Sequence, residues 1–263
     1  MTKGFIRGKK FHPITLYKHV HSRISKPDKF QGIKQNKTVK IRSESEVDPA
    51  YGLFIANGYE DLKHDPNNPE VKQAYDKFIE ETLEQARELQ KNGMKFDPVE
   101  SLHHCVSHGL RCGKGGSYEN ANEMHKDIEN NKHLIYRSSD NDYKDFEDHP
   151  MYRLSDIKNV YGKRMRVNDV FRAVHDINGH NKANHSPFTP EGEQRAYLQH
   201  KKMYSPEAIR ALFTETQGQG NWVNFNRKTG EQNRHFQDIG DLTKLSFPPQ
   251  KAGLFPDGII FCR

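Results

Sequence analysis

Apolar side chains at helical spacing constrain the fold of this chain more than any other feature of its sequence. The clearest case spans about Pro69 to Lys91, where Asn68 can cap a helix and Pro69 suits its first turn. Gly93, in "KNG", stands where helices usually stop. We therefore predict a helix here, with apolar or core positions at Val71, Ala74, Tyr75, Phe78, Thr82 and Leu89.

The same spacing predicts helices over residues 168–179 and 205–218, each ending at a glycine, and a short helix over 119–131. The stretch "HLIYR" that follows resembles a strand, and residues 93–118 are predicted to be a loop. Strand signals are otherwise few. The expected fold class is therefore mainly α with a few short strands, arranged as a single globular domain.

Charge divides the chain into an arm and a body. Residues 1–42 hold twelve Lys or Arg and one acid, a net charge of +11, so the remainder carries about −5 of the overall +6. We expect a basic N-terminal arm over residues 1–45 and a mostly helical metal-binding catalytic domain over 46–263. The arm is suited to nucleic acid, although a solvated tail with no partner fits the same composition.

Composition argues against a membrane or an oxidising compartment. Only 33% of the residues are hydrophobic and the mean hydropathy is −0.99, and no apolar run approaches the roughly 20 residues of a membrane span. The first residues lack the apolar stretch of a signal peptide, and three cysteines do not form a disulfide framework. We expect a cytoplasmic protein, in the host cytoplasm if it is viral.

A candidate zinc site lies in "HHCVSHGLRCGKGGS", which offers His103, His104, Cys105, His108 and Cys112. Its spacing matches no paired-cysteine zinc knuckle. The order of its glycines is also not that of a phosphate-binding loop. A glycine-rich turn is the favoured interpretation of this segment.

The stretch "VHDINGH" places His175 and His180 five residues apart. On a continuous α-helix, five residues rotate the chain by about 500°, so the two rings would point roughly 140° apart. A helix that stops at Gly179 would instead let the backbone turn and bring His180 back toward His175. A pair of metal-chelating histidines needs such a turn.

Glu215, in "FTETQG", is the carboxylate expected to complete the site, because it follows the small, apolar side of its helix. A buried carboxylate is costly unless it is paired or bound to metal. Two imidazoles and one carboxylate form the donor set of non-haem Fe(II) oxygenases. Zinc with an activated water is the alternative, since it uses similar ligands.

Two resemblances bear on this site. "HDINGH" and "FTETQG" resemble the iron-binding motifs of the aromatic amino acid hydroxylases, a likeness that implies iron ligands at His175, His180 and Glu215. Asn178 stands where that family has an apolar residue, the acid of "FTETQG" comes one residue early, and no pterin-binding segment precedes them, so the organic co-reductant is unknown.

The wider pattern "NDVFRAVHDINGH … ETQGQGNWVNF" resembles a family of uncharacterised proteins of bacteriophages and mobile elements. This resemblance spans most of residues 69–256 and implies a viral or mobile-element origin, without an activity.

Two further groups surround the predicted site. Asp176, Glu193 and His200 are expected to orient the ligands or move protons, although Glu193 can equally form an internal salt bridge with Arg195 or Arg172. The segment that follows Glu215 has side chains that can hydrogen-bond to a flat ring and stack on it, so we predict that it forms a wall of the substrate site. The alternative is a glycine-rich turn whose tryptophan fills the core. The members of the predicted wall are Gln217, Gln219, Asn221 and Trp222.

The sequence therefore predicts a mononuclear non-haem iron oxygenase or hydroxylase acting on a small molecule, a nucleotide or a DNA base. An enzyme that acts on a base in duplex DNA must unstack it. Two alternatives remain. One is a non-catalytic phage protein that binds nucleic acid, and the other is a metal-free group-transfer enzyme that modifies DNA.

Overall fold

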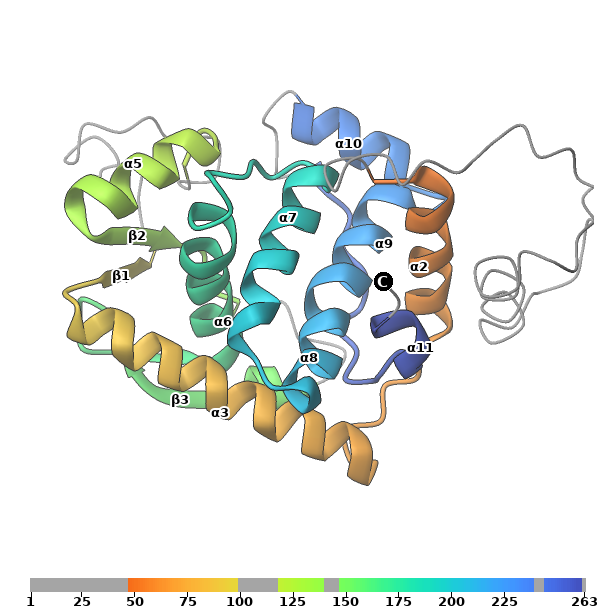
Figure 1. Ribbon diagram of the computed structural model, residues 1–263, viewed down its shortest axis with the longest axis horizontal. Helices are drawn as coiled ribbons and strands as arrows, with labels where there is room; N and C mark the ends of the chain where they lie inside the picture. The colour runs from red at the N-terminus through yellow and green to blue at the C-terminus, as the bar shows by residue number, and fades with distance from the viewer. Residues whose placement is uncertain (1–46, 99–117, 140–146, 239–243, 262–263) are drawn as a thin grey trace, which may run out of the picture.

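The computed structural model describes residues 47–98, 118–139, 147–238 and 244–261, and these residues are mainly helical (Figure 1). The predicted fold class is thereby confirmed. The predicted basic arm lies outside the described residues, and so does the candidate zinc-binding segment over residues 103–112.

Helices α6, α7, α9 and α2 stand side by side, and the long helix α3 runs beneath them (Figure 1). Two short two-stranded sheets lie toward one end, where β1 pairs with β2 in parallel and β3 pairs with β4 antiparallel. The α-helices are α2 (Pro49–Asp61), α3 (Pro69–Lys91), α5 (Ala121–Asn131), α6 (Val167–His175), α7 (Pro190–His200), α8 (Pro206–Phe213), α9 (Gln219–Phe225), α10 (Gly230–Asp238) and α11 (Asp257–Ile260). The strands are β1 (Lys95–Pro98), β2 (His133–Tyr136), β3 (Leu154–Lys158) and β4 (Arg164–Arg166). Two 3₁₀ turns, η2 (Pro150–Tyr152) and η4 (Lys201–Met203), and two π-helical segments, η3 (Asp176–Asn181) and η5 (Thr214–Gly218), complete the elements.

Helix α3 has the bounds that its sequence predicts. Asn68 caps it by accepting hydrogen bonds from the backbone N–H groups of the second and third helical residues, at 3.0 and 3.4 Å. After Asn92 the chain leaves the helix at Gly93, whose φ of +90° is costly for other residues. Helix α5 and strand β2 also match their predicted ranges. The segment predicted as a loop from residue 93 differs, because Lys95–Pro98 pairs with β2 and buries Phe96.

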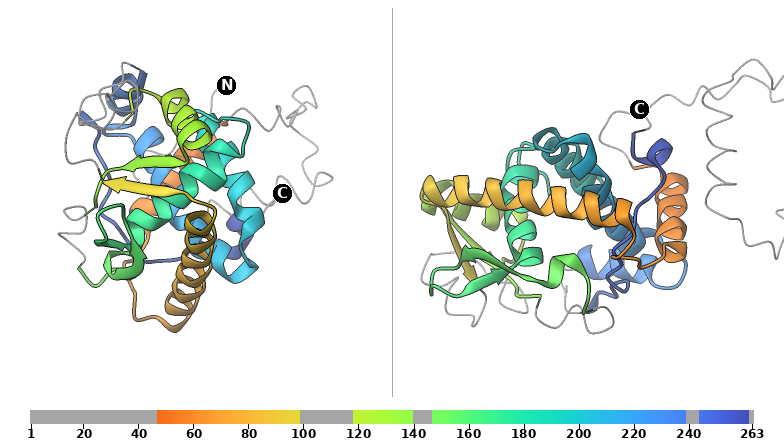
Figure 2. Two further views of the ribbon diagram at one scale, coloured as in Figure 1. Left: turned by 90° about the vertical axis from the view of Figure 1, so that its left-hand side faces the viewer. Right: turned by 90° about the horizontal axis from the view of Figure 1, so that it is seen from below.

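The core consists of two hydrophobic clusters, and α6 lies between them. Phe171 belongs to the cluster formed with α2, α3 and α8, while Val170 and Val174 belong to the cluster beneath the small sheets. Leu83 of α3 packs against both clusters. A helix buried on two sides in this way is a rigid support for any side chain at its end, and His175 is its last residue. In the right-hand view of Figure 2, the long helix α3 runs across the other helices.

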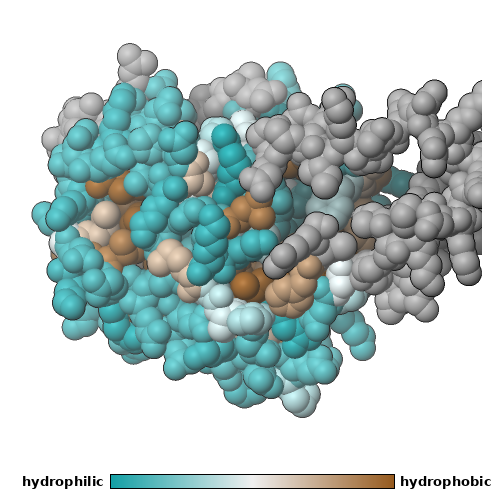
Figure 3. Space-filling view, viewed as in Figure 1, coloured by the Kyte–Doolittle hydropathy of each residue, from teal (hydrophilic) through white to brown (hydrophobic). Residues whose placement is uncertain are grey.

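The surface agrees with the polar composition. The face seen in Figure 3 is mostly hydrophilic, with small separate hydrophobic patches. Within the described ranges, no helix has the length and apolar character needed to cross a membrane.

Candidate metal centre

The histidine pair is brought together by a π-helical turn. Helix α6 does not stop at Gly179 as predicted but continues into η3, which spans Asp176–Asn181. Hydrogen bonds from residue i to residue i+5 place residues five apart about one turn above each other. The rings of His175 and His180 accordingly lie at right angles (86°) with centroids 5.2 Å apart. The two histidines therefore meet as predicted, for a different physical reason.

Gly179 is required for close packing. A Cβ atom added there would lie 3.0 Å from Nδ1 of His175 and 3.1 Å from the carbonyl oxygen of Ala196 in α7. The absence of a side chain thus lets α7 approach the π-helical turn. Glu193, one turn before Ala196, faces the two histidines as a result.

Gly179→Ala should reduce the free energy of unfolding by about 1–3 kcal/mol. The added methyl group would lie too close to the backbone carbonyl oxygen of Ala196, which has little room to move. Gly220 is the matched control, since a Cβ there meets nothing within 4 Å. Gly220→Ala should therefore stabilise the protein by about 0.5–1 kcal/mol through helix propensity alone. Urea unfolding of both variants measures the two effects, and equal effects would refute the packing role of Gly179.

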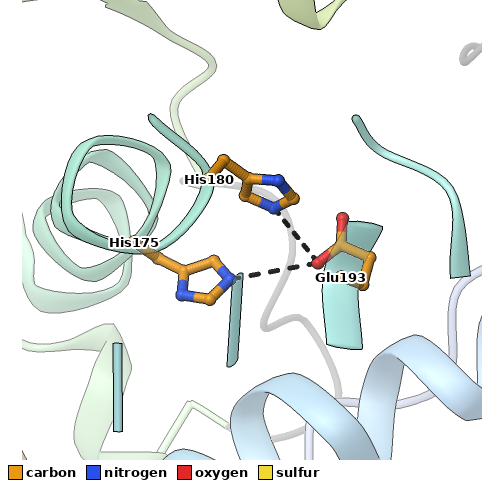
Figure 4. A group of neighbouring side chains, drawn as sticks. All are labelled: His175, His180 and Glu193. Carbon is orange, nitrogen blue, oxygen red and sulfur yellow. Dashed lines mark ion pairs between the residues drawn. The ribbon is translucent and has the colours of Figure 1, made fainter. Parts of the chain in front are cut away.

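His175, His180 and Glu193 form the one group in the described part of the chain whose donor atoms suit a metal, with one atom of each within 4.8 Å of the others (Figure 4). The carboxylate oxygen Oε2 of Glu193 lies 3.3 Å from Nε2 of His180 and 3.9 Å from Nε2 of His175. Metal–ligand bonds of 2.0–2.2 Å allow two donors of one ion to lie up to about 4.2 Å apart. Both distances meet this limit.

His180 is oriented by the loop that follows it. Its Nδ1 lies 3.0 Å from the carbonyl oxygen of Ser186, so this nitrogen carries the hydrogen and Nε2 is directed at Glu193. Burial alone would lower the pKa of His180, but the charge and hydrogen bond of Glu193, the charge of Asp176 and the hydrogen bond to the Ser186 backbone together raise it to about 9. The same pairing keeps the pKa of Glu193 well below its usual range, against the effect of burial. Without a metal ion, the buried His180 and the half-buried Glu193 form an ion pair.

A chain of hydrogen bonds fixes the tautomer of His175. Gln85 donates its amide hydrogen to the carbonyl of Met203, and its Oε1 accepts from Nε2 of His200 at 3.0 Å. Nδ1 of His200 therefore has only a lone pair, which accepts from Nδ1 of His175 at 3.0 Å. Burial lowers the pKa values of both histidines, so both are neutral. Nε2 of His175 is left with a bare lone pair and no hydrogen-bond partner.

Replacing His200 should weaken metal binding without abolishing it. His200→Phe keeps a ring but removes the lone pair that holds His175, and changes of this kind cost roughly 10- to 100-fold in metal affinity. His200→Gln restores an acceptor and should recover part of that loss. Competition titration of Zn(II) against a chelator measures the affinities. Equal affinity in the wild type and in His200→Phe would refute the orienting role.

Asp176 lies beside the group but is not part of it. Its carboxyl is half-buried. Burial and then the charge of Glu193 raise its pKa to about 7, although His180 and Arg172 act in the opposite direction. The role in moving protons that the sequence suggests for Asp176 stays a prediction.

Glu215, the predicted third ligand, lies in a different cluster. Its Oε1 accepts a hydrogen bond from the Tyr75 hydroxyl at 2.5 Å and lies 3.6 Å from Nε2 of His149, while its Oε2 accepts from Gln219 at 2.8 Å. Burial raises its pKa to about 7, against the hydrogen bonds of Tyr75 and Gln219. The structure thus supplies partners other than the histidine pair for this carboxylate.

The helix that carries Glu215 does not end at Gly218, where the sequence predicted its end. Helix α8 continues through η5 into α9 without stopping at Gly218. A Cβ on Gly218 would lie 2.9 Å from the Tyr59 ring and 3.0 Å from that of Phe255. As at Gly179, the glycine permits close packing within a π-helical turn.

The predicted substrate wall divides into two pairs. Gln217 and Asn221 line a narrow pocket together with Glu193, and we call it the Glu193 pocket. Gln219 is instead hydrogen-bonded to Glu215, and the Trp222 indole donates to Glu60 at 2.5 Å. Only the first pair therefore lies beside the candidate metal ligands. The pocket is lined by Val47, Pro190, Glu193, Thr216, Gln217, Gly220, Asn221, Asn224 and Phe225.

Gln85 and Ser186 are site residues that the sequence analysis did not identify, and Asn178 is a third, since its amide donates to Gln85 at 2.9 Å. Gln85 lies on the predicted helix α3 but no nearby motif marks it. The only available signal for Ser186 was its place six residues after His180, in a loop that returns to the histidine.

The chain is similar to no protein-family model, no curated protein and no solved structure at a significant level. The function is therefore inferred from the site itself.

Proposed function

We propose that this chain is a metalloenzyme in which His175, His180 and Glu193 bind one divalent transition-metal ion, Fe(II), and that it oxidises or hydroxylates its substrate. The observation that carries this proposal is the environment of the Nε2 atom of His175. This atom is buried, has no hydrogen-bond partner, and lies 3.9 Å from a carboxylate oxygen. A buried polar atom left unsatisfied in this way costs free energy, which a bound metal would recover.

The donor set favours iron. Two neutral imidazoles and one carboxylate leave other coordination positions open, as in the mononuclear non-haem Fe(II) oxygenases. Bound there, iron would supply the capacity to activate O2. Zinc remains the alternative, because two histidines and a glutamate also form catalytic zinc sites. Among divalent metals zinc binds such ligands more tightly than Fe(II), so affinity alone does not distinguish the two.

The surrounding residues have separate roles in this proposal. His200 and Ser186 hold the two imidazoles in the tautomers that present Nε2 to the ion. Asp176 accepts or returns a proton beside the ligands. Gln217 and Asn221 bind the substrate in the Glu193 pocket. The half-buried carboxylate of Glu193 lines the same pocket.

The test begins with the metal content of protein purified without oxygen, followed by loading of the metal-free protein with Fe(II). One equivalent of iron is expected, and nitric oxide, a probe of open coordination positions, should give an iron–nitrosyl signal in electron paramagnetic resonance. Zinc as the purified metal, or iron that does not react with nitric oxide, would contradict the oxygenase proposal.

A second candidate function rests on the charge of residues 1–42, which is +11. We propose that this arm contacts nucleic acid. The contact would serve an enzyme whose substrate is a nucleotide or a DNA base, and it would equally serve a protein that only binds DNA. Fluorescence polarisation with duplex DNA should show affinity that falls steeply with salt and is lost when residues 1–45 are removed. Binding that is insensitive to both changes would contradict the proposal.

A further inference from the structure

The loop that follows the candidate ligand His180 has a backbone conformation that its residues do not favour by themselves. We call residues 181–186 the Ser186 loop, after the fully buried serine at its end. Asn184 and His185 have φ values of +55° and +57°, in the left-handed region that is unfavourable for residues with a side chain. Two such residues in succession persist only where the surrounding structure holds them.

The orientation of His180 depends on this loop. Nδ1 of His180 lies 3.0 Å from the carbonyl oxygen of Ser186 and 3.1 Å from its hydroxyl oxygen. The backbone N–H of Ser186 donates in return to the carbonyl oxygen of His180 at 3.0 Å. A different loop conformation would take away the acceptor for Nδ1–H, and the ring would then turn its Nε2 away from Glu193.

Helix α5 contacts both ends of the Ser186 loop. At the start of the loop, Nδ1 of His125 donates to Oδ1 of Asn181 at 3.1 Å. Near its end, the His185 ring stacks on the His125 ring, with centroids 4.7 Å apart and planes 27° apart. Nε2 of His185 also lies 2.5 Å from Oε1 of Glu129, one turn further along α5. One helix therefore supplies the side-chain contacts at both ends.

Helix α5 is fixed relative to the histidine pair. Its Met124 and Ile128 belong to the same hydrophobic cluster as apolar side chains of α6, the helix that ends at His175. The two helices thus share one packed core. The contacts of His125 and Glu129 place the Ser186 loop relative to that core.

We propose that α5 holds the metal ligand His180 in place through the Ser186 loop, so that His125, Glu129 and His185 are positioning residues of the metal centre. The inference rests on the proposed function, because it assigns these residues to a ligand of the proposed ion. None of the three touches the ion. They order the loop before the ion arrives, so that this cost is not taken from the free energy of metal binding.

The first measurement is competition titration of Zn(II) against a chelator, in the full chain. Without its anchors the loop should leave its unfavoured conformation, and the apparent affinity should fall by the fraction of molecules that keep it. Glu129→Ala should weaken Zn(II) binding by about threefold to fivefold, a modest effect because both partners of the contact are half-exposed. His185→Asn should weaken it by about tenfold, since the stacking on His125 is lost as well.

The variants are chosen to separate the side-chain contacts from other effects. Asparagine tolerates a left-handed backbone, so His185→Asn tests the side chain alone. The double variant should bind Zn(II) no more weakly than His185→Asn, because Glu129 then has no ring to hold. Glu80→Ala is the matched control and should have no effect, since Glu80 is another half-exposed helical glutamate with a charged partner, Lys77.

The second measurement is the exchange of imidazole Nδ1–H protons with water, followed by nuclear magnetic resonance in the same samples. His175 provides the internal comparison, because its Nδ1–H donates to His200 whereas that of His180 donates to Ser186. In Glu129→Ala and His185→Asn, exchange should accelerate at His180 and stay unchanged at His175. A general loss of stability would accelerate both.

Unchanged Zn(II) affinity in both variants would overturn the inference, and so would an equal loss in Glu80→Ala. Equal acceleration of exchange at His175 and His180 would also overturn it. If the wild type retains no Zn(II), the metalloenzyme proposal fails. The exchange rates of the metal-free proteins then decide whether α5 positions His180.

Discussion

Replacing any one of His175, His180 and Glu193 by alanine should abolish stoichiometric metal binding. Each side chain supplies one of three donors that converge within 4.8 Å. Changes to residues that only orient a ligand already cost roughly 10- to 100-fold in affinity, and loss of a ligand should cost more. Equilibrium dialysis against Fe(II) without oxygen, or against Zn(II), followed by elemental analysis, measures the retained metal.

Glu215→Gln is the matched control, because it neutralises a second buried glutamate that has other partners. It should retain one equivalent of metal. Urea unfolding of each variant shows whether a loss of metal reflects loss of the fold. If Glu215→Gln lost the metal and Glu193→Gln kept it, the ligand set implied by the resemblance to the hydroxylases would be right and the one proposed from the structure would be wrong.

Glu215→Gln should also raise the stability of the metal-free protein above neutral pH by about 3 kcal/mol. Burial raises the pKa of the Glu215 carboxyl from 4.5 to about 7, and one unit of pKa corresponds to about 1.4 kcal/mol. A raised carboxyl pKa means that the folded state holds a proton which the unfolded state releases between these values. The contribution of Glu215 to stability therefore falls as the pH rises from about 4.5 to about 7.

The measurement is the difference in free energy of unfolding between Glu215→Gln and the wild type at pH 5 and at pH 8. The stabilisation by glutamine should be larger by about 2–3 kcal/mol at pH 8. Tyr75→Phe is informative as a second variant, because it removes a 2.5 Å hydrogen bond that favours the ionised form. A difference that does not change with pH would show that Glu215 is ionised in the folded protein throughout.

The helices were predictable where local signals agree. The Asn68 cap, the apolar stripe and Gly93 together define α3, and each acts within a few residues of the chain. Strand β1 was missed because its partner, β2, is nearly forty residues away, and four residues carry too little periodicity. The two π-helical turns were also missed. Gly179 and Gly218 have the appearance of helix stops, and only the neighbouring helices show that they are contact points.

The candidate site was partly predictable for the same reason. The spacing of His175 and His180 is local, so their pairing could be inferred from the sequence. The choice of carboxylate was not local, because it depends on how closely α7 approaches the π-helical turn at Gly179. The pattern of "FTETQG" favoured Glu215 and assigned Glu193 to a supporting role. The structure instead places the carboxylate of Glu193 beside both imidazoles.

The most direct test of the metal centre is anomalous diffraction from a crystal grown with Fe(II) or Zn(II). We expect one anomalous peak about 2.0–2.2 Å from Nε2 of His175, from Nε2 of His180 and from a carboxylate oxygen of Glu193. A peak bound by Glu215, or a metal-loaded crystal in which Nε2 of His175 contacts no ion, would contradict it.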